Sequence, residues 1–308
     1  MTLQQLEYIL ALDRFRHFAK AAEHCHVTQP TLSTMIQKLE DELGVKLFDR
    51  TCQPLVPTAI GEKIVKQAHV VLADARRMSD IIEEEKTTLS GVFRLAVLPT
   101  IAPYLLPRFL SALSVRHPSL ELHVSELKTR EAKQALLTGE VDAALIAEQP
   151  SEEWLSGEMV CYDAFYGYVS RNESLFEKSV LRTSDLTDRK LWLLDEGHCF
   201  RDQLLRFCQM EGARFSQTAY RLGSMETFMR MVESGEGITF IPELAVLQLT
   251  EEQKQLVRPF AIPTPTRRIF LAHSADYMRR RLIAALSEEI RHALPTSMLH
   301  LQPTQYLV

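Results

Sequence analysis

The sequence predicts an α + α/β fold, with a small helical head bearing a short β wing, then one long helix, then a larger α/β domain. Three observations lead to this fold class. Short amphipathic helices fill residues 1–57, apolar residues at heptad spacing run through residues 58–90, and strands alternate with helices across residues 91–308. We take these three ranges as the domains of the chain.

Length and composition agree with an ordinary globular protein. The 308 residues are 46% hydrophobic and 24% charged with a net charge of −5, which excludes a disordered chain and a polycation that coats nucleic acid. No apolar stretch reaches the roughly 18 residues of a membrane span, and residues 1–5 lack a secretory signal. We therefore expect a cytoplasmic protein without membrane contact, whose five cysteines do not form a structural disulfide framework.

The head contains a helix that begins near Thr28 and ends at Gly44, with Pro30 in its first turn, where proline is tolerated. Its predicted buried face is Leu32, Ile36, Leu39 and Leu43. Its opposite face carries polar side chains suited to base edges and phosphates, namely Gln29, Thr31, Ser33, Thr34, Gln37 and Lys38. With the short helix before it and apolar runs at 45–48 and 55–57, this pattern indicates a winged helix-turn-helix.

The charge of the head is unusual for a DNA-binding module. Residues 1–66 contain eight Lys and Arg and eight Asp and Glu, whereas such modules are normally basic. Three of the acids, at positions 40–42, cluster at the far end of the predicted DNA-reading helix. The candidate basic patch is Arg14, Arg16, Lys38, Arg50 and Lys63. We expect the affinity to depend on a dimer or tetramer that adds binding sites.

The long helix carries a heptad seam. Its apolar residues, spaced alternately by four and three, are Ile64, Ala68, Val71, Ala75, Met78 and Ile82. An isolated helix would expose this seam, so we expect it to pair with a second copy of itself. The alternative is that the helix packs on its own domain.

Strands and helices alternate after residue 91. The predicted strands cover 92–98, 120–126, 141–147, 192–194, 238–241 and 269–271, and the first two helices cover 104–117 and 130–138. About 210 residues exceed the usual size of one domain. We therefore expect two subdomains with a cleft or hinge between them, formed by 91–163 with 269–300 and by 164–268.

The segment 195–208 is the most informative for chemistry. Cys199 is expected at the N-terminus of a helix over residues 200–210, where the helix dipole favours a thiolate. His198 and Arg201 add positive potential there, and Asp202 can orient its neighbours. A thiolate attacks peroxide and becomes a sulfenic acid.

Cys208 follows Cys199 by nine positions. On a continuous helix this is about 13.5 Å of rise and half a turn of rotation. A disulfide needs Cα atoms within roughly 7 Å, so the two thiols can join only if the helix unfolds. Oxidation of one sulfur would then become a large conformational change.

Other interpretations of the cysteines remain open. Free cysteines are commonly inert core residues, which is what we expect for Cys25 and is the alternative for Cys199 and Cys208. Neither Cys52 nor Cys161 has a recognisable setting. The spacings lack the pattern of zinc sites, and we predict neither a metal nor a cofactor.

Four motifs in the head and at the start of the long helix resemble the LysR-type transcriptional regulators. They are FAKAA at residues 18–22, VTQPTLS at 27–33, LGVKLFDR at 43–50 and TAIG at 58–61. Within that family, PTIAPYLLP at 99–107, GHCFRDQ at 197–203 and FC at 207–208 are similar to the members that sense hydrogen peroxide. The resemblance spans the whole chain.

The resemblance implies a function for each domain. The head would bind promoter DNA through Gln29, Pro30, Thr31, Ser33, Thr34, Gln37, Lys38 and Arg50. The long helix would form homodimers that associate into homotetramers, and the last domain would resemble two-lobed periplasmic binding proteins. The oxidised form would activate antioxidant genes with RNA polymerase, and glutaredoxin or thioredoxin would reset it.

The resemblance also implies roles at the thiols. Cys199 would be the peroxidatic and Cys208 the resolving cysteine. Thr100, Thr129, His198 and Asp202 would line the peroxide pocket or relay protons, and Arg201 would belong to the same site. One departure is Gln53–Pro54 in the wing, where many relatives carry a basic residue.

Two rival functions stay open. An ordinary LysR-type regulator would bind a small metabolite in the interlobe cleft, with structural cysteines. A thiol peroxidase would turn peroxide over repeatedly, which the DNA-binding pattern of the head argues against. We therefore do not expect an enzyme.

Overall fold

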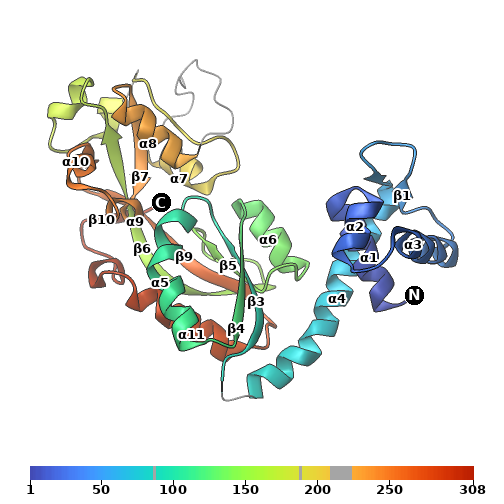
Figure 1. The fold of residues 1–308 in the computed structure, drawn as a ribbon. Coiled ribbons are helices and arrows are strands. Elements are labelled where there is room, and N and C mark those ends of the chain that lie inside the picture. The colour runs from blue at the N-terminus through green and yellow to red at the C-terminus, as the bar shows by residue number, and fades with distance from the viewer. Residues whose placement is uncertain (86–87, 187–188, 209–223) are drawn as a thin grey trace. The chain divides into compact units, whose positions relative to one another are not determined.

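The computed structural model describes residues 1–85, 88–186, 189–208 and 224–308 (Figure 1). It has the predicted fold class, with a winged helix-turn-helix, a long helix and an α/β domain. Within these ranges, no helix is both long enough and apolar enough to cross a bilayer.

The head is built from short helices and a two-stranded wing, and the long helix follows it. In order, these are α1 (Leu3–Phe15), α2 (Phe18–His24), α3 (Gln29–Leu43), β1 (Phe48–Asp49), β2 (Val56–Pro57) and α4 (Ala59–Glu85). The Thr28 hydroxyl accepts the Thr31 N–H at the start of α3, which satisfies one of the free amides there. Gly44 ends the helix at φ +70°, a left-handed conformation that glycine adopts without strain.

The core of the head lies between α1, α3 and the first half of α4. Leu32, Ile36 and Leu39 are buried as predicted. Leu43 is an error of the prediction, since its side chain lies at the surface. Glu40, one of the three clustered acids, is buried. The cause is a turn: the chain doubles back at Gly44, and the following wing covers the Glu40 side of the helix end.

The two halves of α4 have different surroundings. In the first half, Val65, Ala68 and Leu72 are buried in the core of the head, so this part packs on its own domain. In the second half, Met78 is 72% and Ile82 64% exposed. The first half of the seam therefore packs on its own domain. Only the second half is left to pair with a second copy, and that pairing stays a prediction.

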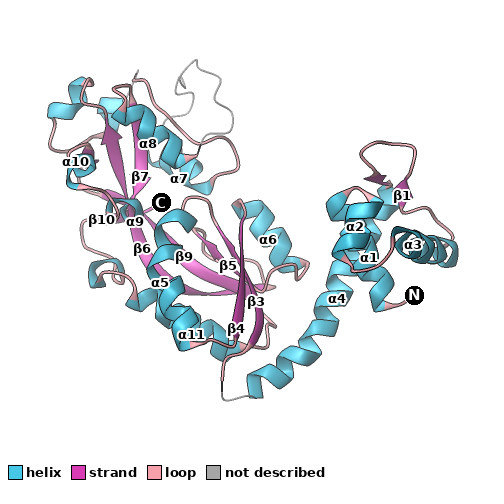
Figure 2. Ribbon diagram, viewed as in Figure 1, coloured by secondary structure: helices cyan, strands magenta, loops and turns pink. Residues whose placement is uncertain are grey.

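The α/β domain contains strands that alternate with helices, as predicted (Figure 2). Its strands are β3 (Gly91–Val97), β4 (Leu120–Glu126), β5 (Ala143–Ile146), β6 (Leu155–Val169), β7 (Ile238–Pro242), β8 (Val257–Pro259), β9 (Thr264–Ser274) and β10 (Gln305–Leu307). Its helices are α5 (Ala102–Arg116), α6 (Thr129–Leu137), α7 (Cys199–Cys208), α8 (Met225–Glu233), α9 (Glu243–Val246), α10 (Glu251–Lys254) and α11 (Arg280–His292). Short 3₁₀ turns are η1 (Ser174–Glu177), η2 (Thr183–Leu186) and η3 (Thr296–Met298).

The described strands join in the order β4-β3-β5-β9-β6-β7, with β10 added to β9 and β8 to β6. β3 is parallel to β4 and β5, and the long strands β6 and β9 are antiparallel to each other. The predicted subdomain boundaries, at residues 163 and 268, fall inside these two continuous strands. The division into subdomains stays a prediction.

One predicted strand is wrong. Residues 192–194 form no regular strand, and beside them Leu191 makes only an isolated bridge to Ile238. The segment lies beside β7 only at Leu191 and Trp192. It then turns at Gly197 into α7, so a ladder of repeated hydrogen bonds does not develop.

Candidate functional site

Helix α7 begins at Cys199 and ends at Cys208, so the two thiols are its first and last residues. Both are buried and both are free. The predicted helix over 200–210 is therefore observed one residue earlier at its start, and positions 209 and 210 lie outside the described residues. An unbroken helix of this length separates the two Cα atoms by about 13.5 Å, well beyond disulfide reach.

A buried arginine lies next to the first turn of α7. Arg267 of β9 is fully buried, and its guanidinium lies 4.9 Å from the centre of the Phe200 ring. Its Nε and Nη2 both contact Oδ2 of Asp163, at 2.9 and 2.8 Å. Its Nη1 donates to the Thr100 hydroxyl and its Nη2 to the Thr100 carbonyl, both at 3.0 Å. The guanidinium is thus fixed by two partners.

The Cys199 thiol is subject to opposing influences. Burial raises the pKa of Cys199, because a thiolate is poorly solvated in the interior, while the charge of Arg267 and a hydrogen bond from Thr129 lower it. The Thr129 hydroxyl is buried and finds no partner of ordinary hydrogen-bond geometry among the described residues. It is therefore free to interact with the sulfur or with an oxygen bound beside it.

The prediction that His198 and Arg201 supply positive potential at Cys199 is wrong. The cation that acts on Cys199 is Arg267, and the net pKa shift is upward because desolvation outweighs the charge. His198 does not supply a positive charge, since burial and the nearby Lys128 lower the pKa of its imidazole below the usual value. Arg201 instead lies 3.7 Å from Asp202.

His198 belongs to a chain of polar contacts that ends the loop before α7. Its Nε2 lies 3.2 Å from Asp195, and Lys128 Nζ lies 3.3 Å from the other oxygen of that carboxylate. The Asp202 side chain is half exposed, and its charge only partly offsets the lowering of the His198 pKa by burial and by Lys128. The sequence-predicted residues Thr100, Thr129, His198, Arg201 and Asp202 all lie on or around this loop and the buried arginine.

Gln203 ties α7 to the neighbouring strand. Its amide nitrogen donates to the Ala147 carbonyl at 2.8 Å, and its carbonyl oxygen is buried without a hydrogen-bond partner among the described residues. A buried acceptor of this kind costs free energy in the reduced fold.

The other three cysteines lie outside α7. Cys25 ends α2 and is only partly buried against the core of the head, so it is less enclosed than predicted. The Cys52 thiol is exposed in the wing, 3.6 Å from Asp49. Cys161 is fully buried in β6, and burial raises the pKa of its thiol well above the usual value.

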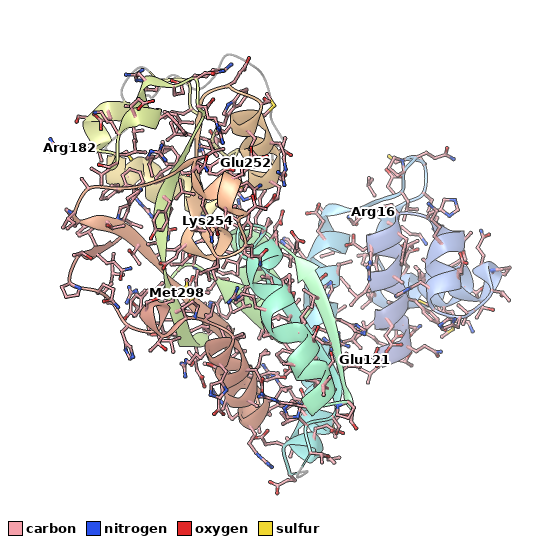
Figure 3. The ribbon with its side chains drawn as sticks, turned by 60° about the vertical axis from the view of Figure 1, so that its left-hand side comes forward. Arg16, Glu121, Arg182, Glu252, Lys254 and Met298 are labelled. Carbon is pink, nitrogen blue, oxygen red and sulfur yellow. The ribbon has the colours of Figure 1, made fainter. Side chains whose placement is uncertain are left out.

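The outer face of α3 is open to solvent along its length. The predicted DNA-contacting residues that are exposed are Gln29, Pro30, Thr31, Thr34, Gln37, Lys38 and Arg50, and Ser33 is partly exposed. Arg16, labelled in Figure 3, caps the end of α1 and pairs with Asp13 at 2.9 Å. The exposed face is therefore polar and available for a groove of DNA.

Two family comparisons cover almost the whole chain. Residues 3–62 match the family described as bacterial regulatory helix-turn-helix protein, lysR family, and residues 86–295 match the LysR substrate binding domain. The chain belongs to the LysR family. It is therefore a transcription regulator with a DNA-binding helix-turn-helix.

Named relatives match this LysR-family regulator end to end. A protein of Haemophilus influenzae named "Hydrogen peroxide-inducible genes activator" is 34% identical over 298 residues, which is 96% of this chain and 99% of the relative. The "DNA-binding transcriptional dual regulator OxyR" of Escherichia coli strain K12 is 34% identical over 291 residues, covering 94% of this chain and 95% of the relative.

Solved structures are similar to the regulator as well. The crystal structure of OxyR from Porphyromonas gingivalis is 53% identical, with a TM-score of 0.67, and covers 71% of this chain and 99% of that one. A full-length OxyR variant from Pseudomonas aeruginosa is 36% identical, with a TM-score of 0.76, and covers 94% and 98%.

Sequence reasoning missed Arg267, Asp163 and Gln203. A usable signal exists for the first two, since each is a charged residue within a largely apolar strand, and buried charges occur almost only in pairs. Pairing them required knowing that β6 and β9 are neighbours. Lys128 and Asp195 gave no such signal, because each lies in a loop whose position only the fold sets.

Proposed function

We propose that this LysR-family regulator senses hydrogen peroxide at Cys199 and couples a Cys199–Cys208 disulfide to the activation of promoters. One observation carries the proposal: two buried free thiols are the first and last residues of a single helix beside a buried arginine. The disulfide and this helix cannot exist together. The names of the relatives, which refer to peroxide-inducible genes, support the same ligand.

The chemistry requires two steps. In the first, the Cys199 thiolate attacks one oxygen of hydrogen peroxide, the O–O bond breaks, and the products are a sulfenic acid and hydroxide, which takes up a proton to become water. In the second, the Cys208 sulfur attacks the sulfenic sulfur, an S–S bond forms, and the S–O bond breaks to release a second water. The two thiols together supply the two electrons that reduce the peroxide.

The surrounding polar groups have assigned roles in this proposal. Thr129 and Thr100 hold the peroxide oxygens, and Arg267 stabilises the thiolate and the leaving hydroxide. The neutral His198, oriented by Asp195, relays the proton, and Arg201 with Asp202 closes the pocket on the solvent side.

Cys208 is held back in the reduced state. Burial raises its pKa to about 12, so in the folded helix it is a neutral thiol and a poor nucleophile. Unfolding of α7 both brings it within reach of Cys199 and exposes it to water, where its ordinary pKa of about 8.5 returns. Separation and protonation therefore both delay the disulfide until the helix rearranges.

The rearrangement provides the signal. Unfolding α7 breaks the stacking of Phe200 on Phe165 and the edge-to-face contact of Phe207 with Phe260. In the proposal, this repacking alters how dimers, joined through α4, associate into tetramers on promoter DNA and contact RNA polymerase. Glutaredoxin or thioredoxin then reduces the disulfide. Peroxide reduction is stoichiometric, so the chain acts as a regulator and not as an enzyme.

The decisive experiment replaces each thiol separately. Cys199→Ser is expected to abolish peroxide-dependent promoter activation in a reporter strain. Cys208→Ser is expected to form a sulfenic acid on Cys199 but no intramolecular disulfide, as read by mass spectrometry of peroxide-treated protein.

Cys161→Ser and Cys52→Ser serve as matched controls, because these thiols lie outside α7, and both variants are expected to respond like the parent. Activation by peroxide in the Cys199→Ser variant would contradict the proposal and favour a regulator that responds to a metabolite. Peroxide consumption over many turnovers in the presence of a thiol reductant, without an effect on promoter activation, would favour the peroxidase.

A further inference from the structure

A carboxylate is buried where α3, the wing and α4 meet. The Glu40 side chain is 0% exposed, although two acids beside it on the helix are exposed. Its Oε1 accepts the backbone N–H of Leu47 at 2.8 Å and that of Phe48 at 3.4 Å. Its Oε2 pairs with Lys46 at 3.1 Å and with Arg50 at 3.3 Å. Four donors therefore converge on one buried carboxylate.

We propose that Glu40 is a positioning residue for DNA binding, which holds the start of the wing and the Arg50 guanidinium in a fixed place relative to the DNA-reading helix α3. The proposal concerns the DNA-binding activity of the family and is independent of the peroxide chemistry at Cys199. It gives a function to an acid whose charge, from sequence alone, weakens the case for DNA binding.

Arg50 is held from two sides. One is the Glu40 carboxylate, and the other is the Phe18 ring of α2, whose centre lies 5.4 Å from the guanidinium carbon. The side chain is nevertheless 38% exposed. An arginine fixed in this way loses less conformational freedom when it contacts a phosphate than a free surface arginine does. Its free N–H groups remain available for that contact.

The Leu47 peptide carries the constraint from α3 to α4. Its N–H donates to Glu40, and its carbonyl accepts the N–H of Thr58, just before α4, at 2.9 Å. Helix α4 also lies very close to this peptide, since a Cβ on Gly61 would lie 1.9 Å from the Leu47 carbonyl oxygen. The same carboxylate thus fixes the wing against both the DNA-reading helix and the helix that follows it.

This proposal and a simple charge effect predict opposite changes in DNA affinity when Glu40 is neutralised. If acids near the end of α3 only repel DNA, then neutralising any of them strengthens binding. If Glu40 positions Arg50, then neutralising Glu40 weakens binding, because the cation loses its anchor. Glu42 provides the comparison, since it lies two residues away, is exposed, and contacts only the terminal ammonium among the pairs described for it.

The experiment measures binding of the reduced full chain to a fluorescein-labelled duplex selected from a random-sequence pool by the unsubstituted protein. The variants are Glu40→Gln, Arg50→Gln, the double variant and Glu42→Gln. Glutamine keeps an oxygen for the Leu47 N–H and replaces the charged oxygen that faces Arg50 with a neutral amide nitrogen. The readouts are Kd by fluorescence anisotropy, the slope of log Kd against log salt concentration, and thermal unfolding.

Glu40→Gln and Arg50→Gln are each expected to weaken binding roughly threefold to tenfold and to reduce the salt slope by about one. The double variant is expected to bind like Arg50→Gln alone, and Glu42→Gln to bind at least as tightly as the parent. A loss of stability alone would not reduce the salt slope. It would also not make the double variant bind like Arg50→Gln alone.

Three results would overturn the proposal. They are unchanged or tighter binding by Glu40→Gln, a loss that adds in full to that of Arg50→Gln, or an unchanged Kd and slope for Arg50→Gln. The last result is decisive even if Glu40→Gln fails to fold, because without an Arg50 contact there is nothing for Glu40 to position. None of these outcomes depends on whether the regulator responds to peroxide.

Discussion

Burial and positive charge compete at Cys199. The interior raises the thiol pKa, while Arg267 and Thr129 lower it, and the net direction is upward. A buried thiol with a raised pKa holds little thiolate at neutral pH, so the chemistry depends on groups that stabilise the thiolate and the leaving oxygen as they form. If Cys199 is the peroxide-reactive thiol, as proposed, single side chains around its sulfur are expected to control the reaction rate.

Thr129→Val tests this dependence. Removing the hydroxyl is expected to raise the Cys199 pKa further and to slow the reaction with peroxide at pH 7 by about fivefold, the equivalent of about 1 kcal/mol for one hydrogen bond. In both proteins the rate should rise with pH as the thiolate fraction grows, and the variant's curve should lie at higher pH. Stopped-flow fluorescence at several pH values measures this.

A buried threonine elsewhere supplies the control for that variant. Thr239→Val also loses a buried hydroxyl, which donates to the Trp192 carbonyl at 2.8 Å, and its rate profile is expected to match the parent. Coincident profiles for Thr129→Val and the parent would show that the hydroxyl does not act on the sulfur.

At the scale of elements, α7 is a short helix held by its packing. Ten residues are too few for a stable isolated helix, so contacts of Phe200, Gln203 and Leu204 with the rest of the domain maintain it. Phe207 also contacts Tyr306 of the C-terminal strand β10, with ring centres 6.4 Å apart. In the proposed switch, the strength of these contacts sets how readily the helix unfolds after Cys199 is oxidised.

Leu204→Ala is expected to accelerate the disulfide step. Truncating a buried leucine costs roughly 2–5 kcal/mol. If α7 unfolds before the thiols meet, a gain of tenfold or more in the rate from sulfenic acid to disulfide follows, since about 1.4 kcal/mol corresponds to tenfold. Quenched-flow mass spectrometry resolves this step from the initial oxidation of Cys199.

Arg206→Ala is the matched control on the same helix, because Arg206 is exposed and its truncation leaves the buried contacts intact. An equal disulfide rate in Leu204→Ala and Arg206→Ala would mean that unfolding of α7 does not limit the switch. The thermal stability of each variant, measured in parallel, separates local from global destabilisation.

At the scale of the whole molecule, the exposed half of α4 points to self-association. Met78, Ile81 and Ile82 are all largely exposed, and apolar residues gathered on one helix segment mark an interaction surface. Since the other half of the helix is used within its own domain, we expect this segment to join two copies of the chain.

Met78→Glu with Ile82→Glu is expected to shift the protein from dimers towards monomers and to weaken promoter binding by tenfold or more, because a buried pair of like charges replaces an apolar contact. Sedimentation velocity and anisotropy read the two effects. Ser79→Glu, which adds one such charge at a neighbouring exposed position, should leave both unchanged. Dimers that persist in the double variant would place the interface elsewhere.

The amino-acid sequence alone determined the local structure and the thiol spacing. The helix over α3, the end of that helix at Gly44 and the nine-position separation of Cys199 and Cys208 all follow from residues that are close in the chain. Periodicity and capping act within a few residues, so they can be recognised without knowledge of the fold.

Only the tertiary structure decided which charges act at each site. Arg267 contacts Asp163 and Thr100 across 104 and 167 residues of chain, and Glu40 is buried because the wing folds back on it. Such contacts depend on which strands and loops become neighbours, and desolvation follows from that arrangement. This is why the cation at Cys199 and the buried carboxylate of the head could not be assigned from the sequence.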